Sequence, residues 1–90
     1  MQSKTLRYPP EVYNDILEKM AKEARLYNDR FISMSKAKWI ASYDRRFINK
    51  RIRRFNNKEQ ARIISEMHNN NMIRVIRCSR VEILNKGPGF

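Results

Sequence analysis

The stretch TLRYPPEVYNDILEKMAKEA, from Thr5 to Ala24, decides how the chain begins to fold. Its first residues belong to an alternating run, SKTLRY at 3–8, which is typical of a β-strand and stops at Pro9. Proline cannot continue the hydrogen bonding of a strand, but it suits the first turn of a helix. The stretch therefore predicts a short strand followed directly by a helix, and it leaves the partner of that strand open.

The helix predicted after the two prolines runs from about Pro10 to Tyr27. Val12, Ile16 and Met20 recur every four residues and predict one apolar stripe that faces a core. Acidic residues of this segment precede lysines by four positions, which stabilises a helix surface. These acids therefore need no catalytic explanation.

A second helix is predicted from about Lys36 to Phe55, with Ser35 as the preferred N-cap and Ser33 as the alternative. Apolar residues within it follow the spacing of one helical face, and Trp39 lies at the edge of that face. The residues of the face are Ile40, Tyr43, Phe47, Ile48, Ile52 and Phe55.

A third helix is predicted from about Lys58 to Asn69, because NNK at 56–58 breaks the preceding helix and NNN at 69–71 forms a turn. Its apolar positions are expected to face the core. They are Ala61, Ile64 and Met67.

The segment MIRVIRCSRVEIL, at 72–84, is rich in Val and Ile and predicts strand. Its alternation slips in the middle, so two arrangements fit. Either a bulge lies near Ile76 and Arg77, or the segment is a tight hairpin that turns near Cys78 to Arg80.

The elements together predict an α+β fold with the order β-α-α-α-β. We expect one small domain over 1–85, with a strand-helix-helix core at 3–55, an extension at 56–85 and a tail at 86–90. A chain of 90 residues buries a modest share of its surface, so a two-fold dimer is also expected.

The charge balance points to a polyanionic partner. Twenty Lys and Arg face nine Asp and Glu, which gives a formal net charge of +11. Residues 31–58 hold nine of the basic side chains and a single acid, Asp44. Nucleic acid, either DNA or RNA, is the commonest partner of so basic a domain.

We expect a phosphate clamp on the polar side of the second helix, because the planar fork of arginine suits phosphate. A solvated helix face or a helix lying on a membrane surface would give a similar stripe. The residues expected to contact phosphate are Arg45, Arg46, Lys50, Arg51, Arg53 and Arg54.

Arg74, Arg77 and Arg80 form a second basic set on the C-terminal strand. Contact with nucleic acid is one role for them. Protection of a strand edge against aggregation explains them equally well.

Other residues give little reason to expect an enzyme. His68 is the single histidine, Cys78 is the single cysteine, and both glycines lie in the tail, so no phosphate-binding glycine loop is present. We therefore expect no catalytic residues, no metal and no cofactor. The lone cysteine fits a reducing compartment, and the N-terminus has no apolar core like that of a secretory signal, so a cytoplasmic location is expected.

Two stretches carry a resemblance to a known family. LRYPPEVYNDILEKMAKEA and SMSKAKWIASYDRRF are similar to the opening and to the start of the second helix of Arc-type ribbon-helix-helix repressors. The resemblance covers 3–53 and implies a homodimeric DNA-binding transcriptional regulator whose paired strands enter a major groove.

Within that family the strand residues have distinct roles, which the resemblance carries to this chain. Ser3, Thr5 and Arg7 would face the bases, Leu6 would face the core together with Tyr8, and the backbone N–H of Ser35 would meet a phosphate.

The residues also leave other interpretations open. The strand at 3–8 could pair with 72–84 in the same chain, and the basic surface would then bind phosphates of RNA or DNA without reading sequence. Tyr8, Trp39 and Tyr43 could in that case stack on bases. A phage-type RNA-binding protein that acts on a host RNA enzyme or toxin, and a basic module that docks on an acidic protein and inhibits it, are the alternative functions.

Overall fold

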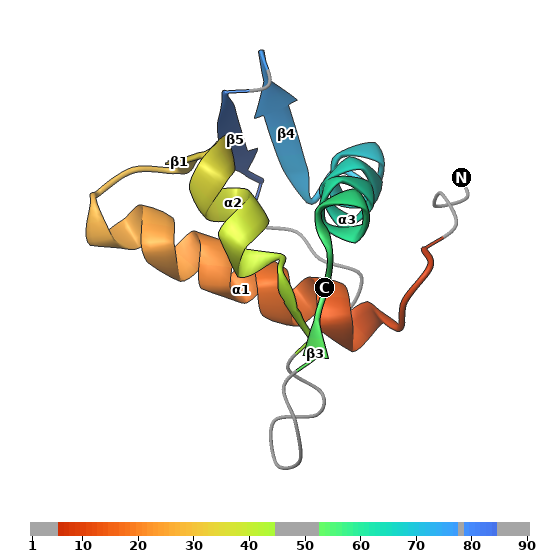
Figure 1. Ribbon diagram of the computed structural model, residues 1–90. Helices are drawn as coiled ribbons and strands as arrows, with labels where there is room; N and C mark the ends of the chain where they lie inside the picture. The colour runs from red at the N-terminus through yellow and green to blue at the C-terminus, as the bar shows by residue number, and fades with distance from the viewer. Residues whose placement is uncertain (1–5, 45–52, 78, 85–90) are drawn as a thin grey trace.

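The computed structural model describes residues 6–44, 53–77 and 79–84. These residues form an α+β fold in which helices pack on a three-stranded antiparallel sheet, with a separate two-stranded hairpin (Figure 1). In chain order the elements are α1 (Pro10–Leu26), β1 (Phe31–Ser33), α2 (Met34–Ile40), β2 (Tyr43–Asp44), β3 (Arg53–Arg54), α3 (Asn57–Asn69), β4 (Ile73–Ile76) and β5 (Arg80–Ile83).

The first helix confirms the prediction from its apolar stripe. A proline opens α1, and the chain leaves the helix at Asn28, whose φ of 53° lies in the left-handed region that asparagine tolerates better than most residues. The inward face of the helix buries six side chains. They are Val12, Tyr13, Ile16, Leu17, Met20 and Ala24.

The strand predicted at 3–8 is wrong for its described part, because residues 6–8 are not strand. Residues 1–5 lie outside the described residues. The side chain of Tyr8 instead fixes this part of the chain. The centroid of its ring lies 5.0 Å from that of Phe55, and its hydroxyl donates to Glu59 at 3.0 Å. Side-chain packing therefore fixes the segment before Pro9.

The third strand of the sheet comes from the residues between the first and the second predicted helix. β1 pairs antiparallel with β5, with Ile32 opposite Val81, and β5 pairs on its other side with β4. The simple order β-α-α-α-β is therefore wrong, because a strand lies between the first two helices.

The C-terminal segment forms the tight hairpin, one of the two arrangements that its alternation allowed. Val75 lies opposite Val81, and the Ser79 N–H donates to the Ile76 carbonyl oxygen at 3.0 Å to close the turn. Arg77 occupies the turn with a φ of 51°. The inward row of the sheet, which includes Ile32 and Val81, is buried.

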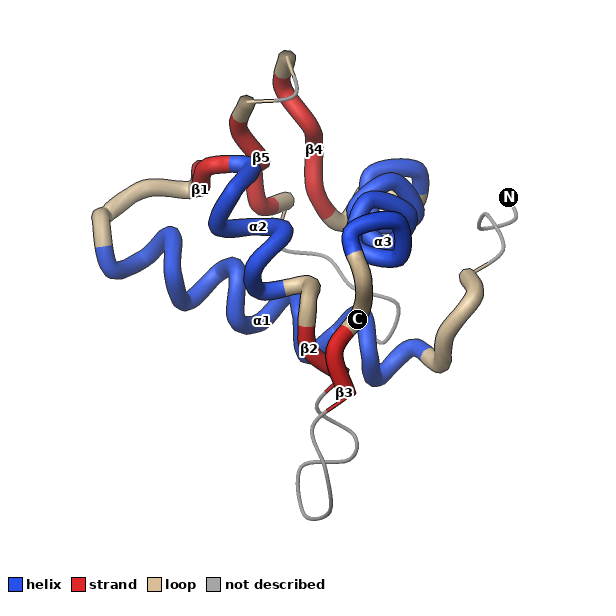
Figure 2. The backbone as a smooth tube through the Cα atoms, viewed as in Figure 1, coloured by secondary structure: helices blue, strands red, loops and turns tan. Residues whose placement is uncertain are grey.

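The core lies between this sheet and the helices (Figure 2). In that view α1 crosses below the sheet, and α3 lies beside β4, which it contacts. Buried apolar side chains from each of these layers meet in one cluster. Besides those of α1, its largest fully buried members are Phe55, Ile63, Met67, Ile73 and Val81.

The second helix is much shorter than predicted. α2 begins at Met34, and the Ser33 hydroxyl accepts the Lys36 N–H at 3.1 Å, so Ser33 and not Ser35 is the N-cap. The helix ends at Ile40.

Beyond α2 the chain turns back on itself. Tyr43 pairs with Arg54 across β2 and β3, and the Phe55 N–H donates to the Ser42 carbonyl oxygen at 2.7 Å. The prediction of a helix through to Phe55 is therefore wrong. Of its expected apolar face, Ile40 and Phe55 are buried and Tyr43 is half-buried, while the residues between 45 and 52 lie outside the described residues.

The third helix confirms its predicted range within one residue at its start. Asn56 and Glu59 form a capping box, in which each side chain accepts the backbone N–H of the other residue, at 2.8 and 3.1 Å. The expected inward face is correct for Ile64 and Met67, but Ala61 is exposed.

A part-buried polar contact joins α1 to α3. The Tyr13 hydroxyl donates to Glu66 Oε1 at 2.5 Å and accepts the Tyr8 N–H at 3.2 Å. Burial, followed by the hydrogen bond to the Glu66 carboxylate, raises the pKa of Tyr13 well above its ordinary value. The protonated hydroxyl of Tyr13 therefore links α1 to α3 and to the segment before Pro9.

Removing this hydroxyl should destabilise the fold. In Tyr13→Phe the Glu66 carboxylate and the Tyr8 N–H both lose a partner in a part-buried site, so the free energy of unfolding should fall by about 1–3 kcal/mol. Urea unfolding followed by circular dichroism measures the change. Tyr27→Phe is the matched control, because Tyr27 is 73% exposed, and equal stability of the two variants would contradict the assignment.

The capping box supports a second stability prediction. Asn56→Ala should lower the free energy of unfolding by about 1 kcal/mol, because the Glu59 N–H loses its acceptor, whereas Asn56→Ser should retain most of the stability. Asn57→Ala, one position further into the helix, is the control. A loss as large for Asn57→Ala as for Asn56→Ala would show that the cap is not the cause.

Candidate nucleic-acid interface

The structure describes only two of the six basic residues that were expected to clamp phosphate. Arg54 is an exposed residue of β3, the strand that it forms with Arg53. A basic ridge along one continuous helix is therefore wrong, because α2 ends before this segment and β2 pairs with β3. The other four residues lie outside the described residues. They are Arg45, Arg46, Lys50 and Arg51.

Little of the expected ribbon lies within the described residues. Arg7 is exposed, whereas Ser3 and Thr5 lie outside the described part of the chain. Ser35 is exposed in the first turn of α2, two residues after the cap. Reading of bases by Ser3, Thr5 and Arg7 thus stays a prediction.

Four residues of α2 and of the β2–β3 hairpin form a group of alternating cations and aromatic rings, which we call the Trp39 cluster. Lys36 Nζ lies 5.3 Å from the centroid of the Trp39 ring, and Arg54 Cζ lies 5.4 Å from that of Tyr43. The two rings meet edge to face with centroids 5.8 Å apart. Both distances from cation to ring are within the range of a cation–π interaction.

Local structure explains how the Trp39 cluster forms. Lys36 and Trp39 are three residues apart in a helix, so their side chains share a face. Tyr43 and Arg54 are opposite residues in an antiparallel pair, which places their side chains on the same side of the hairpin. The turn between α2 and β2 then brings the two pairs together.

The exposure of the Trp39 cluster is unusual for its residue types. Trp39 is 56% exposed, one of the few large apolar side chains that the described residues leave open to solvent. Two residues of the cluster, Tyr43 and Arg54, lie close in sequence to the two ends of 45–52. This segment holds four basic residues and no acid. An aromatic surface next to a segment so rich in basic residues suits a ligand that offers both rings and phosphates.

A second cationic surface lies on the outer face of the sheet. Across the three strands Phe31, Glu82 and Arg74 are opposite one another, and Arg80 Cζ lies 4.8 Å above the Phe31 ring. Arg30 Cζ is 6.0 Å from the same ring.

Glu82 balances part of the charge on this outer face. Its carboxylate oxygens lie 3.3 Å from Arg30 Nε and 3.5 Å from Arg74 Nη1, although both arginines remain largely exposed. Of the second basic set, Arg74 and Arg80 share this face, while Arg77 lies in the turn. The sheet is therefore a weaker candidate than the Trp39 cluster.

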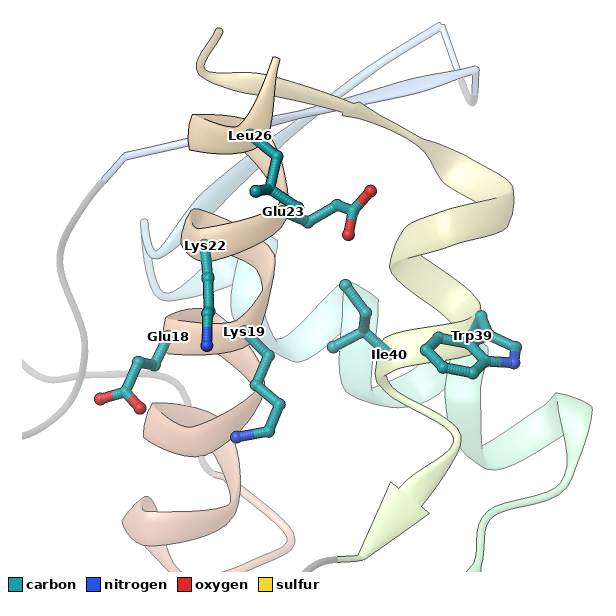
Figure 3. Close-up of a pocket in the computed structure, with 7 residues that line it drawn as sticks. All are labelled: Glu18, Lys19, Lys22, Glu23, Leu26, Trp39 and Ile40. Atoms are coloured by element: carbon teal, nitrogen blue, oxygen red, sulfur yellow. The ribbon is translucent and has the colours of Figure 1, made fainter. Parts of the chain in front are cut away.

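A groove of about 290 Å³ runs between α1 and α2 (Figure 3). Trp39 and Ile40 line it from α2, opposite acidic and basic residues of α1 and the exposed Leu26. The lining of α1 is mixed in charge, so this groove does not favour an anion. Its charged residues are Glu18, Lys19, Lys22 and Glu23.

The single histidine has a structural contact. His68 Nδ1 accepts the Val75 N–H at 3.2 Å, which occupies a donor of the outer strand β4. Among the described residues no group of three or more His, Cys, Asp or Glu could hold a metal ion. Within the same residues no helix has the length and apolar character needed to cross a membrane.

Sequence reasoning had named Trp39 and Tyr43 as possible stacking residues but missed Lys36 of the Trp39 cluster and Phe31 of the cationic sheet surface. Lys36 could have been found from its spacing of three to Trp39 in a helix. Phe31 could not, because the strand that presents it is three residues long and lies in what resembles a connection.

Comparisons with protein-family models, with curated proteins and with solved structures each found no match to this chain.

Proposed function

We propose that this chain binds single-stranded nucleic acid without strong sequence preference, through the Trp39 cluster and the basic segment 45–52. The observation that carries the proposal is the Trp39 ring, 56% exposed and flanked by Lys36 and by the Tyr43–Arg54 pair. An unpaired base can stack on such a ring, whereas the bases of a duplex are already stacked.

Two kinds of contact are expected to contribute to the binding free energy: stacking on the aromatic rings and neutralisation of phosphates by the cations. Stacking of one base on an aromatic side chain contributes about 1–3 kcal/mol. Each phosphate neutralised on a single strand adds about 0.7 to the slope of log affinity against log salt. The Trp39 cluster supplies Lys36 and Arg54, and the adjoining segment supplies four more basic residues.

The reading of duplex DNA by a ribbon of two chains remains a separate prediction. It needs Ser3 and Thr5, which lie outside the described residues, and a second copy of the chain. The three-stranded sheet that the structure describes is formed within one chain, with β5 in the centre. Stacking of a strand on the Trp39 cluster needs no dimer, and sedimentation of the purified chain measures its oligomeric state.

The proposal predicts a direct optical signal. Trp39 is the only tryptophan of the chain, so oligouridylate that stacks on it should quench the intrinsic fluorescence. Trp39→Ala should weaken binding of labelled oligouridylate, measured by anisotropy, by about tenfold. Lys36→Ala and Arg54→Ala should each lower the salt slope by about 0.7.

The control for charge is Arg62→Ala, an exposed position of α3 that removes one positive charge outside the Trp39 cluster. It should leave the fluorescence change intact. Tighter binding to duplex DNA than to oligouridylate at equal salt, or an affinity that does not vary with salt, would overturn the proposal. Loss of affinity in Arg62→Ala as large as in Lys36→Ala would show that only net charge matters.

A protein partner is the second candidate, and one observation favours it. Leu26 is 71% exposed and lines the groove between α1 and α2 together with Trp39. Exposed apolar residues that border one groove are typical of a protein-binding site. Leu26→Ala should weaken a protein complex and leave oligouridylate binding unchanged, so this variant distinguishes the two functions.

A further inference from the structure

A second groove lies on the other side of α2, between that helix, α3 and β4. It has a volume of about 460 Å³, within the range of small-molecule sites. Consecutive residues of α2 face the two grooves: Lys38 lines this one, and Trp39 lines the groove toward α1. Two different surfaces thus meet along one short helix.

The lining of the second groove is apolar at its base and positive at its edges. Ile64, Val75 and Met34 provide apolar surface, and Lys38 and Arg77 provide the charge. The described lining includes no acid, in contrast to the mixed charges of the groove between α1 and α2. Charge complementarity therefore selects an anionic ligand with an apolar body.

His68 adds a directed donor to this lining. Because its Nδ1 accepts the Val75 N–H, the neutral ring carries its proton on Nε2, which leaves an N–H as the polar group that it can offer to a ligand. The contact also fixes the ring against β4. One N–H donor beside two cations suits a phosphate group.

Two cations match a phosphate monoester better than a diester. A monoester carries about −1.5 to −2 charges at neutral pH, whereas each internal phosphate of a strand carries one. Only the end of a strand can bear a monoester. A strand that stacks on Trp39 has to cross α2, whose diameter with side chains is about 10–12 Å, to reach Lys38.

We propose that the groove between α2, α3 and β4 binds the phosphorylated terminal nucleotide of the same single strand that stacks on the Trp39 cluster. Lys38 and Arg77 bind the terminal phosphate, and the apolar base of the groove receives the nucleobase. This inference rests on the proposed function and adds to it a preference for one chemical end of the strand.

The test compares three labelled oligouridylates that differ only in a 5′-phosphate, a 3′-phosphate or no terminal phosphate. The chain should bind one of the phosphorylated strands about tenfold more tightly than the unphosphorylated strand. Equal affinities for all three would overturn the inference and leave the proposed function standing. Absence of binding to any of them would overturn both.

Two variants should remove the preference by different means. Arg77→Asn removes a cation but keeps a residue that tolerates the φ of 51°, so the fold should lose no stability. Ala61→Phe fills the groove from an exposed position without changing charge. Both should bind the unphosphorylated strand as the unaltered chain does and should lose the tenfold difference.

Arg62→Ala is the matched control for both variants. It removes one positive charge, as Arg77→Asn does, and it follows Ala61 in α3 but does not line the groove. It should keep the preference for the phosphorylated strand. A preference that survives Ala61→Phe would place the terminal phosphate elsewhere and would overturn the assignment of the groove.

Discussion

The return of the chain at Ser42 is the constraint on which the rest of the structure depends. The Ser42 hydroxyl donates to the Trp39 carbonyl oxygen at the end of α2, and its own carbonyl oxygen accepts the Phe55 N–H. These two bonds occupy carbonyl oxygens that would accept backbone N–H groups if the helix continued. They bring Phe55 into the core beside Tyr8, and they start α3 from Asn56. The same closure places Arg54 against Tyr43, and so creates the Trp39 cluster.

Local signals were sufficient for the elements that depend on local chemistry. The apolar stripe and prolines of α1, the asparagines at 56–57 and 69–71 that bound α3 and the slipped alternation at 72–84 each have a short-range cause, and the structure has the corresponding helix or hairpin. The second helix shows the limit of such signals. Ile40 and Phe55 are buried in the structure, as a helical face requires, but a hairpin meets the same requirement through contacts far apart in sequence.

The candidate site was predictable in composition and not in geometry. The surplus of positive charge and the aromatic residues Trp39 and Tyr43 can be read from the sequence. The pairing of Tyr43 with Arg54 cannot, because it depends on where α2 ends, whereas that of Trp39 with Lys36 follows from helical spacing. The partial neutralisation of two arginines by Glu82 could not be predicted for a similar reason. These arginines come from β4 and from the residue before β1, and only the register of the sheet brings them close to Glu82.

The positions of the acids in this chain decide which cations are balanced. Long-range attraction of a polyanion is therefore distinct from its recognition by contact. Acids balance cations along α1, where Asp15 bonds Lys19 at 3.2 Å, and on the sheet, where Glu82 lies between two arginines. The sequence between β2 and β3 contains four basic residues and no acid, so we expect the field that draws a polyanion to be strongest near that segment. That field is screened over about 8 Å at physiological ionic strength, whereas stacking acts at contact and is little affected by salt. Salt should therefore weaken the encounter with a strand far more than it changes the environment of Trp39 once the strand is bound.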